Sequence, residues 1–502
     1  MRSALRSICF ALAPAAALLA ACELALALLG RDAHSYGVAH GFDPRARYID
    51  ADPAQPGAFV TRYYAGEQPE VRVAPRDERT RVVLFGGSNT EGFPHAFLEQ
   101  CLNDARPSQR PAFEVVNLGR RGYGSARIAL LFEQALALAP DICVFYEGHN
   151  EFIERGFELE LAARGNALER AGIAAAAHLR TFHALVDAWQ SDAPDESAAR
   201  EPALPEKHQW DYDQFRALTY DQTLERLAGF RANAARMCDL ARARGARMLL
   251  VTAISNDLVA PFASNPPRGT DAASAAALQQ RLRAAREQFP ARYRGLWPLG
   301  PQDRLHQKDW WQPPSPVPSE VAALRLRAPA DAGPLFPYWA QPEHWSPKLR
   351  AYIALLDAFL RRELSDSERA EVEAAAALVD AILAEYPEHA QALYARATCA
   401  YLRGDAAAAA RDFRAAARYD CAPRKASDAT NGMLRELAGA RGVALWDADA
   451  WARARMPDGI VGYELMSDEC HLHERARRPL MIELARAIAA LDARAPDGAD
   501  AR

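Results

Sequence analysis

The sequence predicts an α/β fold in which a doubly wound parallel sheet carries a helical insertion. Three observations predict it. Short apolar runs rich in β-branched and aromatic residues recur along the chain and several end at glycine, as in "VVLFGG" and "DICVFYEG". Amphipathic segments alternate with these runs, which is typical of a parallel sheet with helices on both faces. A long stretch without this alternation separates the fourth such unit from the fifth.

The strand-like and helix-like segments follow one another as successive units of such a sheet. In chain order they lie at 82–85, 95–102, 113–119, 126–138, 141–148, 227–245 and 246–255, and at 431–449, where a helix, a glycine and a strand follow one another. The strand-like runs are short and apolar throughout, as expected for strands that are buried on both faces.

The bulk composition indicates a globular protein. The chain has 502 residues, of which 50% are hydrophobic and 25% are charged. These values are ordinary for folded proteins. The formal net charge is -5, from 60 basic and 65 acidic residues. Binding of nucleic acid needs a concentrated basic surface, so no nucleic-acid partner is predicted.

The N-terminus predicts a signal anchor. Arg2 and Arg6 precede an apolar run over 8–29 that contains one charged residue, Glu23. Such a run is typical of an export signal or a transmembrane helix. Because the arginines come first, we expect a cytoplasmic N-terminus and a periplasmic or equivalent extracytoplasmic location for the rest of the chain.

Two features of the cysteines leave alternatives open. The run "LAAC" at 19–22 is similar to a lipoprotein processing box, which would make Cys22 a lipidated first residue, but the apolar run continues beyond it and favours an uncleaved anchor. The eight cysteines contain no CxxC pair and no Cys/His spacing typical of zinc, so neither a metal nor another cofactor is predicted. Export permits disulfides, but buried free thiols are the equal alternative.

The expected organisation follows from these patterns. It consists of the anchor (1–30), a linker and N-terminal extension (31–78), the first part of the core (79–260), a Pro- and Trp-rich insertion (261–346), a helical insertion (347–422), the last part of the core (423–492) and a tail (493–502). The tryptophans at 297–345 could stack against sugar rings. A structural lid with buried tryptophans is the favoured alternative.

The helical insertion contains a stretch similar to a tetratricopeptide helix pair. The residues whose intervals carry this similarity are Leu393, Ala397, Gly404, Asp405, Ala409, Phe413, Ala416 and Asp420. In such a pair, small residues let two helices approach and the aromatic residue fills the gap. One repeat cannot bury its own faces, so we expect it to stack on a helix over 368–386. A protein partner could bind here, and an alanine-rich hairpin without a binding role is the alternative.

The turn "GGSNT" places Ser88 directly after a predicted strand. A phosphate-binding loop would need a Lys-Ser or Lys-Thr ending, and a nucleotide fold would need further spaced glycines; neither is present. A serine on a tight turn before a helix is instead well placed as a nucleophile, with backbone N–H groups near it that can bind an oxyanion. A simple turn is the alternative, and this segment alone does not distinguish the two.

Three further segments are expected at the same edge, because functional groups of open α/β sheets collect at the carboxyl ends of the strands. "VVNLGRRGYGS" offers the backbone N–H of Gly119 or Gly122, and "FYEGHNEF" offers the amide of Asn150. In "SDECHLHERARR", Asp468 and His471 precede an amphipathic helix. A serine nucleophile needs a histidine to accept its proton and a carboxylate to orient that histidine.

Two neighbouring side chains, Glu469 and His473, compete for the same two roles. Either of them could equally be a surface residue, and the spacing alone does not separate them from Asp468 and His471.

The order and spacing of these four segments resemble the SGNH (GDSL) hydrolase superfamily, whose blocks contribute a serine, a glycine, an asparagine and an Asp-x-x-His pair. The resemblance implies that Ser88 is the nucleophile, His471 the base and Asp468 the group that orients it. It also implies an oxyanion hole formed by the N–H groups of Ser88 and Gly122 and the amide of Asn150.

The chain departs from the family pattern at two places. Gly-Gly-Ser replaces the usual Gly-Asp-Ser at 86–88, and "GHNE" replaces the usual Gly-x-Asn-Asp, with Glu151 in last position. Neither departure removes a catalytic atom. The arrangement is similar to a bacterial subgroup in which an anchored SGNH domain is interrupted by tetratricopeptide-like helices, which implies a flavodoxin-like sheet.

The resemblance therefore implies an extracytoplasmic serine esterase that hydrolyses an ester, such as an acetyl group on a carbohydrate. Two alternatives stay open. An O-acyltransferase acting on cell-surface polysaccharide would pass the acyl group to a sugar hydroxyl instead of water. A membrane-tethered scaffold would bind a partner through the helical segment and keep a degenerate hydrolase domain.

Overall fold

The computed structural model describes most of the chain and divides it into two compact units. The described residues are 2–29, 48–61, 71–105, 112–154, 179–182, 184–185, 218–262, 264, 271–297, 358–456 and 458–493. One unit comprises Met1–Asp77, Leu130–Leu138 and Phe157–Asp211, and the other comprises Glu78–Ala129, Ala139–Gly156 and Tyr212–Arg502.

The first unit contains a long helix and a small antiparallel sheet. The helix α1 (Arg2–Leu28) has 27 residues, and its Glu23 accepts hydrogen bonds from the backbone of Arg180 (3.0 Å) and Thr181 (2.7 Å). The strands are β1 (Ile49–Ala51), β2 (Phe59–Thr61) and β3 (Arg72–Val73). Among the described residues, no helix has the length and apolar character needed to cross a membrane. The anchor expected over 1–30 stays a prediction.

The second unit is built on a five-stranded parallel sheet in the order β5-β4-β6-β7-β8. This is the strand order 2-1-3-4-5 of flavodoxin-like doubly wound sheets. The parallel sheet predicted from the apolar runs is therefore confirmed. Its strands are β4 (Thr80–Gly86), β5 (Phe113–Asn117), β6 (Ile142–Tyr146), β7 (Arg247–Val251) and β8 (Ala444–Trp446).

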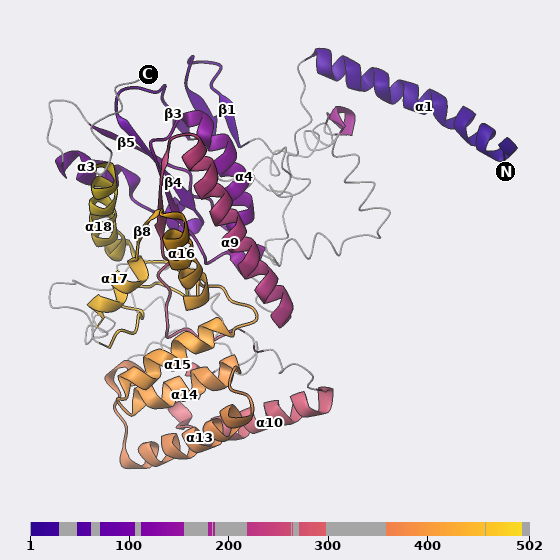
Figure 1. Cartoon of the computed structure of the whole chain (residues 1–502). Coiled ribbons are helices and arrows are strands. Elements are labelled where there is room, and N and C mark those ends of the chain that lie inside the picture. The colour runs from indigo at the N-terminus through magenta and orange to yellow at the C-terminus, as the bar shows by residue number, and fades with distance from the viewer. Residues whose placement is uncertain are drawn as a thin grey trace, which may run out of the picture. The chain divides into compact units, whose positions relative to one another are not determined.

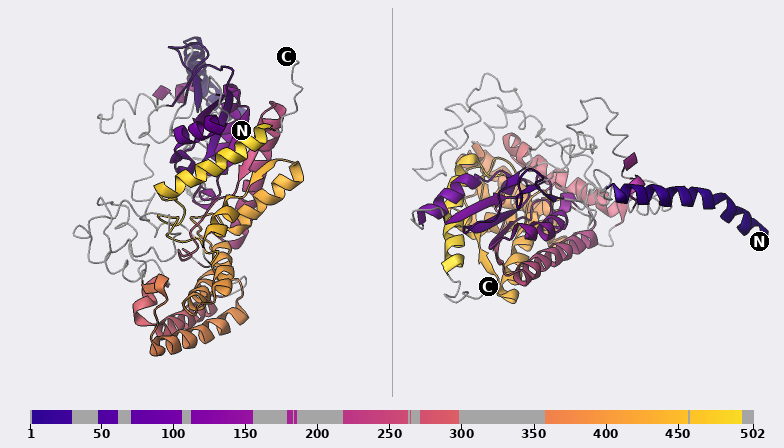
Figure 2. Two further views of the ribbon diagram at one scale, coloured as in Figure 1. Left: turned by 90° about the vertical axis from the view of Figure 1, so that its left-hand side faces the viewer. Right: turned by 90° about the horizontal axis from the view of Figure 1, so that it is seen from above.

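Helices cover both faces of this sheet (Figures 1 and 2). Leu84 and Val144 pack on one face in a core that includes Leu484, and Phe145 packs on the other with its ring 6.2 Å from that of Phe230. Alternate residues of a strand thus enter different layers, which explains why these strands are apolar throughout. The helices are α3 (His95–Ala105) and α18 (Glu474–Ala493) on the first face, and α9 (Tyr220–Ala243) and α16 (Asp428–Arg441) on the second.

Four helices of the insertion form a second core within the same unit (Figure 1). Phe413 is buried between Tyr394 and Tyr401, with ring centroids 5.3 and 6.4 Å away. Three aromatic rings thus fill the space between the helices of this pair, and its assignment as a tetratricopeptide-like repeat stays a prediction. The helices are α10 (Ala272–Gln288), α13 (Asp366–Glu385), α14 (Ala390–Leu402) and α15 (Ala406–Arg418).

The helix α10 lies in the Pro- and Trp-rich segment (261–346). No helix was predicted there from the sequence. The alanine, leucine, glutamine and arginine residues of α10 are good helix formers, and Asp271 caps it by accepting from the backbone N–H of Ser274 (2.7 Å). Trp297 is a core residue whose ring meets that of Phe289 edge-on. The tryptophans at 310, 311, 339 and 345 lie outside the described residues.

We expect Phe413→Ala to lower the free energy of unfolding of the helical core by about 3–5 kcal/mol, because it removes a fully buried ring and leaves a cavity. Denaturant unfolding of the full chain, followed by helical circular dichroism, measures the loss. Leu378→Ala is the matched control, since Leu378 is 41% exposed in the neighbouring helix. Equal losses in the two variants would contradict the prediction.

Candidate active site

Ser88 lies where β4 ends and the short helix α2 (Ser88–Glu91) begins. The turn is tight, because a Cβ on Gly86 would lie 2.2 Å from the backbone oxygen of Tyr146 and 2.0 Å from Thr90 Oγ1. Only glycine fits so close to a neighbouring strand. The side chain of Ser88 is half-buried at the carboxyl end of the sheet.

The structure brings Ser88 together with His471 and Asp468. Ser88 Oγ lies 2.7 Å from His471 Nε2, and His471 Nδ1 lies 2.8 Å from Asp468 Oδ2. The other oxygen of Asp468 accepts from the backbone N–H groups of Cys470 (2.8 Å) and His471 (2.6 Å). The three-residue spacing therefore closes a turn around the carboxylate and presents the imidazole to the serine.

Asn89 joins the serine turn directly to this loop. Its Nδ2 donates to the backbone oxygen of Cys470 (2.8 Å), and its Oδ1 accepts from the backbone N–H of Leu472 (3.4 Å). This role of Asn89 was not predicted from the sequence. The only signal was a polar residue directly after the serine in "GGSNT".

The charges of Asp468 and His471 depend on each other. Burial disfavours the charged form of both side chains, but their mutual attraction and hydrogen bond outweigh it. The pKa of Asp468 is therefore lowered and that of His471 is raised from their ordinary values. An ionised Asp468 accepts the proton of Nδ1, which leaves Nε2 of a neutral His471 to accept a proton from Ser88.

The two competing residues have other surroundings. His473 is buried with Nε2 3.1 Å from the backbone oxygen of Tyr463, and burial lowers its pKa to about 4. Burial and the adjacent charge of Asp468 raise the pKa of Glu469 to about 6. Of the two histidines, the structure places His471 against Ser88.

The donors predicted for an oxyanion hole lie on the loops beside this turn. Asn150 Nδ2 donates to the backbone oxygen of Tyr123 (3.1 Å), and it would lie 2.1 Å from a Cβ on Gly87. Gly122 has a φ of +72° and faces open space, and no acceptor is recorded for its N–H among the described residues. The N–H of Gly119, by contrast, donates to Asn117 Oδ1 (2.9 Å). Of the two glycines, Gly122 is therefore the one whose backbone N–H could bind an oxyanion.

A buried network of two acids and two arginines holds the loop of Gly122. Arg226 Nη2 lies 2.7 Å from Glu151 Oε2 and 2.6 Å from Glu154 Oε2. Arg127 Nε donates to Glu154 (2.8 Å), and Arg127 Nη2 donates to the backbone oxygen of Gly122 (2.6 Å). Truncating one member of such a network would leave an uncompensated buried charge.

The same acids also hold the start of α4 (Ser125–Ala135). Glu154 accepts from the backbone N–H groups of Gly124 and Ala126, both at 3.0 Å, and Glu151 accepts from the hydroxyl of Ser125 (2.9 Å). Negative charge at a helix N-terminus is stabilising. Glu151, the last residue of "GHNE", thus helps to hold the start of this helix. The roles of Glu154, Arg127 and Arg226 in the network were not predicted from the sequence.

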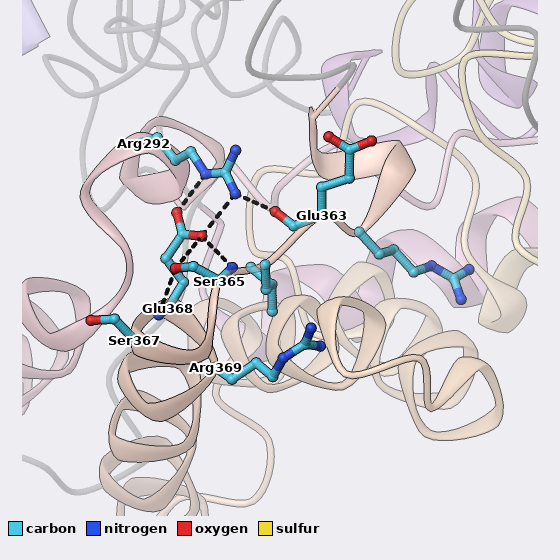
Figure 3. Close-up of a pocket in the computed structure, with 8 residues that line it drawn as sticks. Arg292, Glu363, Ser365, Ser367, Glu368 and Arg369 are labelled. Carbon is cyan, nitrogen blue, oxygen red and sulfur yellow. Dashed lines mark hydrogen bonds and ion pairs between the residues drawn. The ribbon is translucent and has the colours of Figure 1, made fainter.

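A separate pocket of about 730 Å³ lies in the helical insertion (Figure 3). Three of its polar side chains hold the start of α13: Arg292 Nε pairs with Glu368 Oε1 (2.6 Å), and the hydroxyl of Ser365 caps the helix. These three side chains therefore have a structural role.

The thiols form no disulfide among the described residues. Asp468, Cys470 and His471 are the one described group of side chains spaced closely enough to hold a metal ion. Two of these side chains already bond to each other, so a metal there would compete with the contact between His471 and Asp468.

Comparisons with known proteins show only distant similarity. No protein-family model and no curated protein matches the chain. A Bacteroides fragilis protein assigned as an acylhydrolase has 13% sequence identity and a TM-score of 0.20 over 57% of this chain and 89% of its own. A GDSL-like lipase from Bacteroides thetaiotaomicron has 14% identity and a TM-score of 0.19 over 58% and 92%. These TM-scores are too low to support an inference about this chain.

We expect the imidazole of His471 to keep its proton at pH values above the ordinary pKa of histidine, because Asp468 raises the pKa of His471. Asp468→Asn should lower the titration midpoint, since burial is then opposed only by the weaker attraction of Glu469. Nitrogen NMR of the histidines in the full chain measures both midpoints. His473, with its pKa of about 4, is the internal control. A midpoint for His471 that Asp468→Asn leaves unchanged would contradict the prediction.

Proposed function

We propose that the chain is a serine esterase of the SGNH type, with Ser88 as nucleophile, His471 as general base and Asp468 as the group that orients the base. One observation carries the proposal: the continuous contact from Ser88 Oγ to His471 Nε2 (2.7 Å) and from His471 Nδ1 to Asp468 Oδ2 (2.8 Å). Both distances suit hydrogen bonds, and the first suits proton transfer.

In the first half of the reaction, Ser88 Oγ bonds to the ester carbonyl carbon while His471 Nε2 takes the hydroxyl proton. The carbonyl electron pair moves onto oxygen. When this intermediate collapses, the C–O bond to the alcohol breaks, and the alcohol leaves with the proton from His471. In the second half, water attacks the acyl-serine and gives a proton to His471, which returns it to Ser88 as the acid leaves. Asp468 stays ionised throughout.

The oxyanion formed in both halves would be bound by the N–H groups of Ser88 and Gly122 and by the amide of Asn150. Two observations support this assignment. No atom of the described residues occupies the space where a side chain on Gly122 would lie, and Asn150 Nδ2 lies close to Gly87, the residue before the nucleophile. A donor of this kind is worth about 3 kcal/mol in the transition state.

The location and the substrate class rest on the sequence alone. The apolar run over 8–29 supports an extracytoplasmic site anchored at the membrane, and acetyl groups on carbohydrate are the substrate class that the family resemblance suggests. The O-acyltransferase differs from the esterase only in the acceptor of the second half-reaction. The transferase and the scaffold stay predictions.

We expect Ser88→Ala to lower the turnover of p-nitrophenyl acetate by the full chain by about 10³-fold or more, because it removes the hydroxyl that is proposed to form the acyl intermediate. Steady-state hydrolysis is followed by release of p-nitrophenol. Ser367→Ala is the control, since Ser367 is an exposed serine of α13. Equal turnover by wild type and Ser88→Ala would exclude the serine mechanism for this substrate.

We expect Asn150→Ala to lower kcat for the same ester by about 10²–10³-fold with little change in KM, because the amide acts on the oxyanion and not on the ground state. His473→Asn is the comparison, since it alters a buried polar side chain that the mechanism does not use. A rise in KM with kcat unchanged would assign Asn150 to substrate binding instead.

A further inference from the structure

The carboxyl group of Glu147 lies between the two backbone segments that carry the proposed oxyanion donors. Glu147 directly follows β6 and is 1% exposed. Its Oε2 accepts from the backbone N–H of Gly87 (2.6 Å), and its Oε1 accepts from the backbone N–H of Asn150 (2.8 Å). Gly87 precedes the nucleophile and Asn150 carries the amide donor, so one side chain holds both segments.

The same carboxyl group takes space that a side chain at position 87 would need. A Cβ on Gly87 would lie 2.5 Å from Glu147 Oε2 and 2.1 Å from Asn150 Nδ2. The φ of Gly87 is -84°, so it is the lack of space, and not the backbone conformation, that requires glycine. Gly87 and Glu147 are therefore complementary, and the departure from Gly-Asp-Ser makes room for a carboxyl group that arrives from the next strand.

Burying this group is costly. Burial raises the pKa of Glu147 to about 8, and the nearby carboxylate of Glu151 acts in the same direction. The two N–H donors bond to different oxygens of Glu147, and an amide in its place would turn an NH₂ group, which is itself a donor, toward one of them. Buried carboxyl groups without a paired cation are expensive and collect at functional sites.

We propose that Glu147 is a positioning residue that sets the distance between the Ser88 N–H and the Asn150 amide, and thereby the shape of the oxyanion hole. The inference rests on the proposed function, since it concerns donors assigned there. A displacement of either donor by a fraction of an ångström would weaken its hydrogen bond to the oxyanion and leave the contact between Ser88 and His471 intact.

The test is Glu147→Gln, which keeps the size of the side chain but offers one acceptor oxygen instead of two. We expect kcat for p-nitrophenyl acetate to fall about 10–100-fold with KM changed less than about threefold. Glu99→Gln is the matched control, because Glu99 Oε2 also ties down a neighbouring backbone N–H, that of Val115 (2.8 Å). The NMR midpoint of His471 should stay as in wild type.

A double-mutant cycle separates positioning from loss of stability. If Glu147 acts through the amide of Asn150, Glu147→Gln should cost much less in the Asn150→Ala background than in wild type. Additive losses, or a loss of kcat no larger than that of Glu99→Gln at equal Tm, would overturn the inference. Ser88→Ala is measured alongside. Wild-type turnover by that variant would refute the proposed function itself, whereas an inactive Ser88→Ala with additive losses would refute only the role of Glu147.

Discussion

The carboxylate of Asp468 is the constraint on which the site depends. It accepts the backbone N–H groups of Cys470 and His471 on one oxygen and the imidazole of His471 on the other. Hydrogen bonds to an ionised acceptor are strong enough to offset burial, and the lowered pKa of Asp468 reflects this balance. The same charge therefore shapes the loop and selects the tautomer of His471, and Asn89 attaches that loop to the turn of Ser88.

The other side of the site uses buried charge in a different way. Under the loop of Gly122, the carboxylates of Glu151 and Glu154 are balanced by the guanidinium groups of Arg127 and Arg226. Such a network adds little net stability compared with an apolar core, but it penalises every arrangement in which one partner is missing. A loop held in this way has few alternative positions, which is what the proposed role of Gly122 as an oxyanion donor needs.

The sequence predicts the sheet well because runs such as 82–85 and 141–148 are apolar throughout, and a parallel strand covered on both faces needs that composition. The sequence also predicts that Ser88 and the Asp468 loop lie at the same edge of the sheet, because Ser88 follows an apolar strand and the Asp468 loop precedes an amphipathic helix. The spacing alone did not separate His471 from His473, since only the side-chain direction decides, and the choice of His471 came from the resemblance to the Asp-x-x-His pair. The sequence did not reveal Arg226, which reaches Glu154 across 72 residues. The helix α10 was hidden by the proline-rich composition around it.

The two insertions (261–422) can together interrupt the core because the ends of this combined segment meet. The backbone N–H of Phe262 donates to Asp420 (2.8 Å), and Ser255 donates to the backbone oxygen of Ala426 (2.8 Å). When the ends of an inserted segment are bonded together, its length costs the rest of the fold little. Asn256 lies at this junction and donates to the backbone oxygen of Asp468 (3.0 Å). The insertion therefore leaves the core beside Asp468, and the hydrogen bond of Asn256 ties its base to the loop that carries this carboxylate.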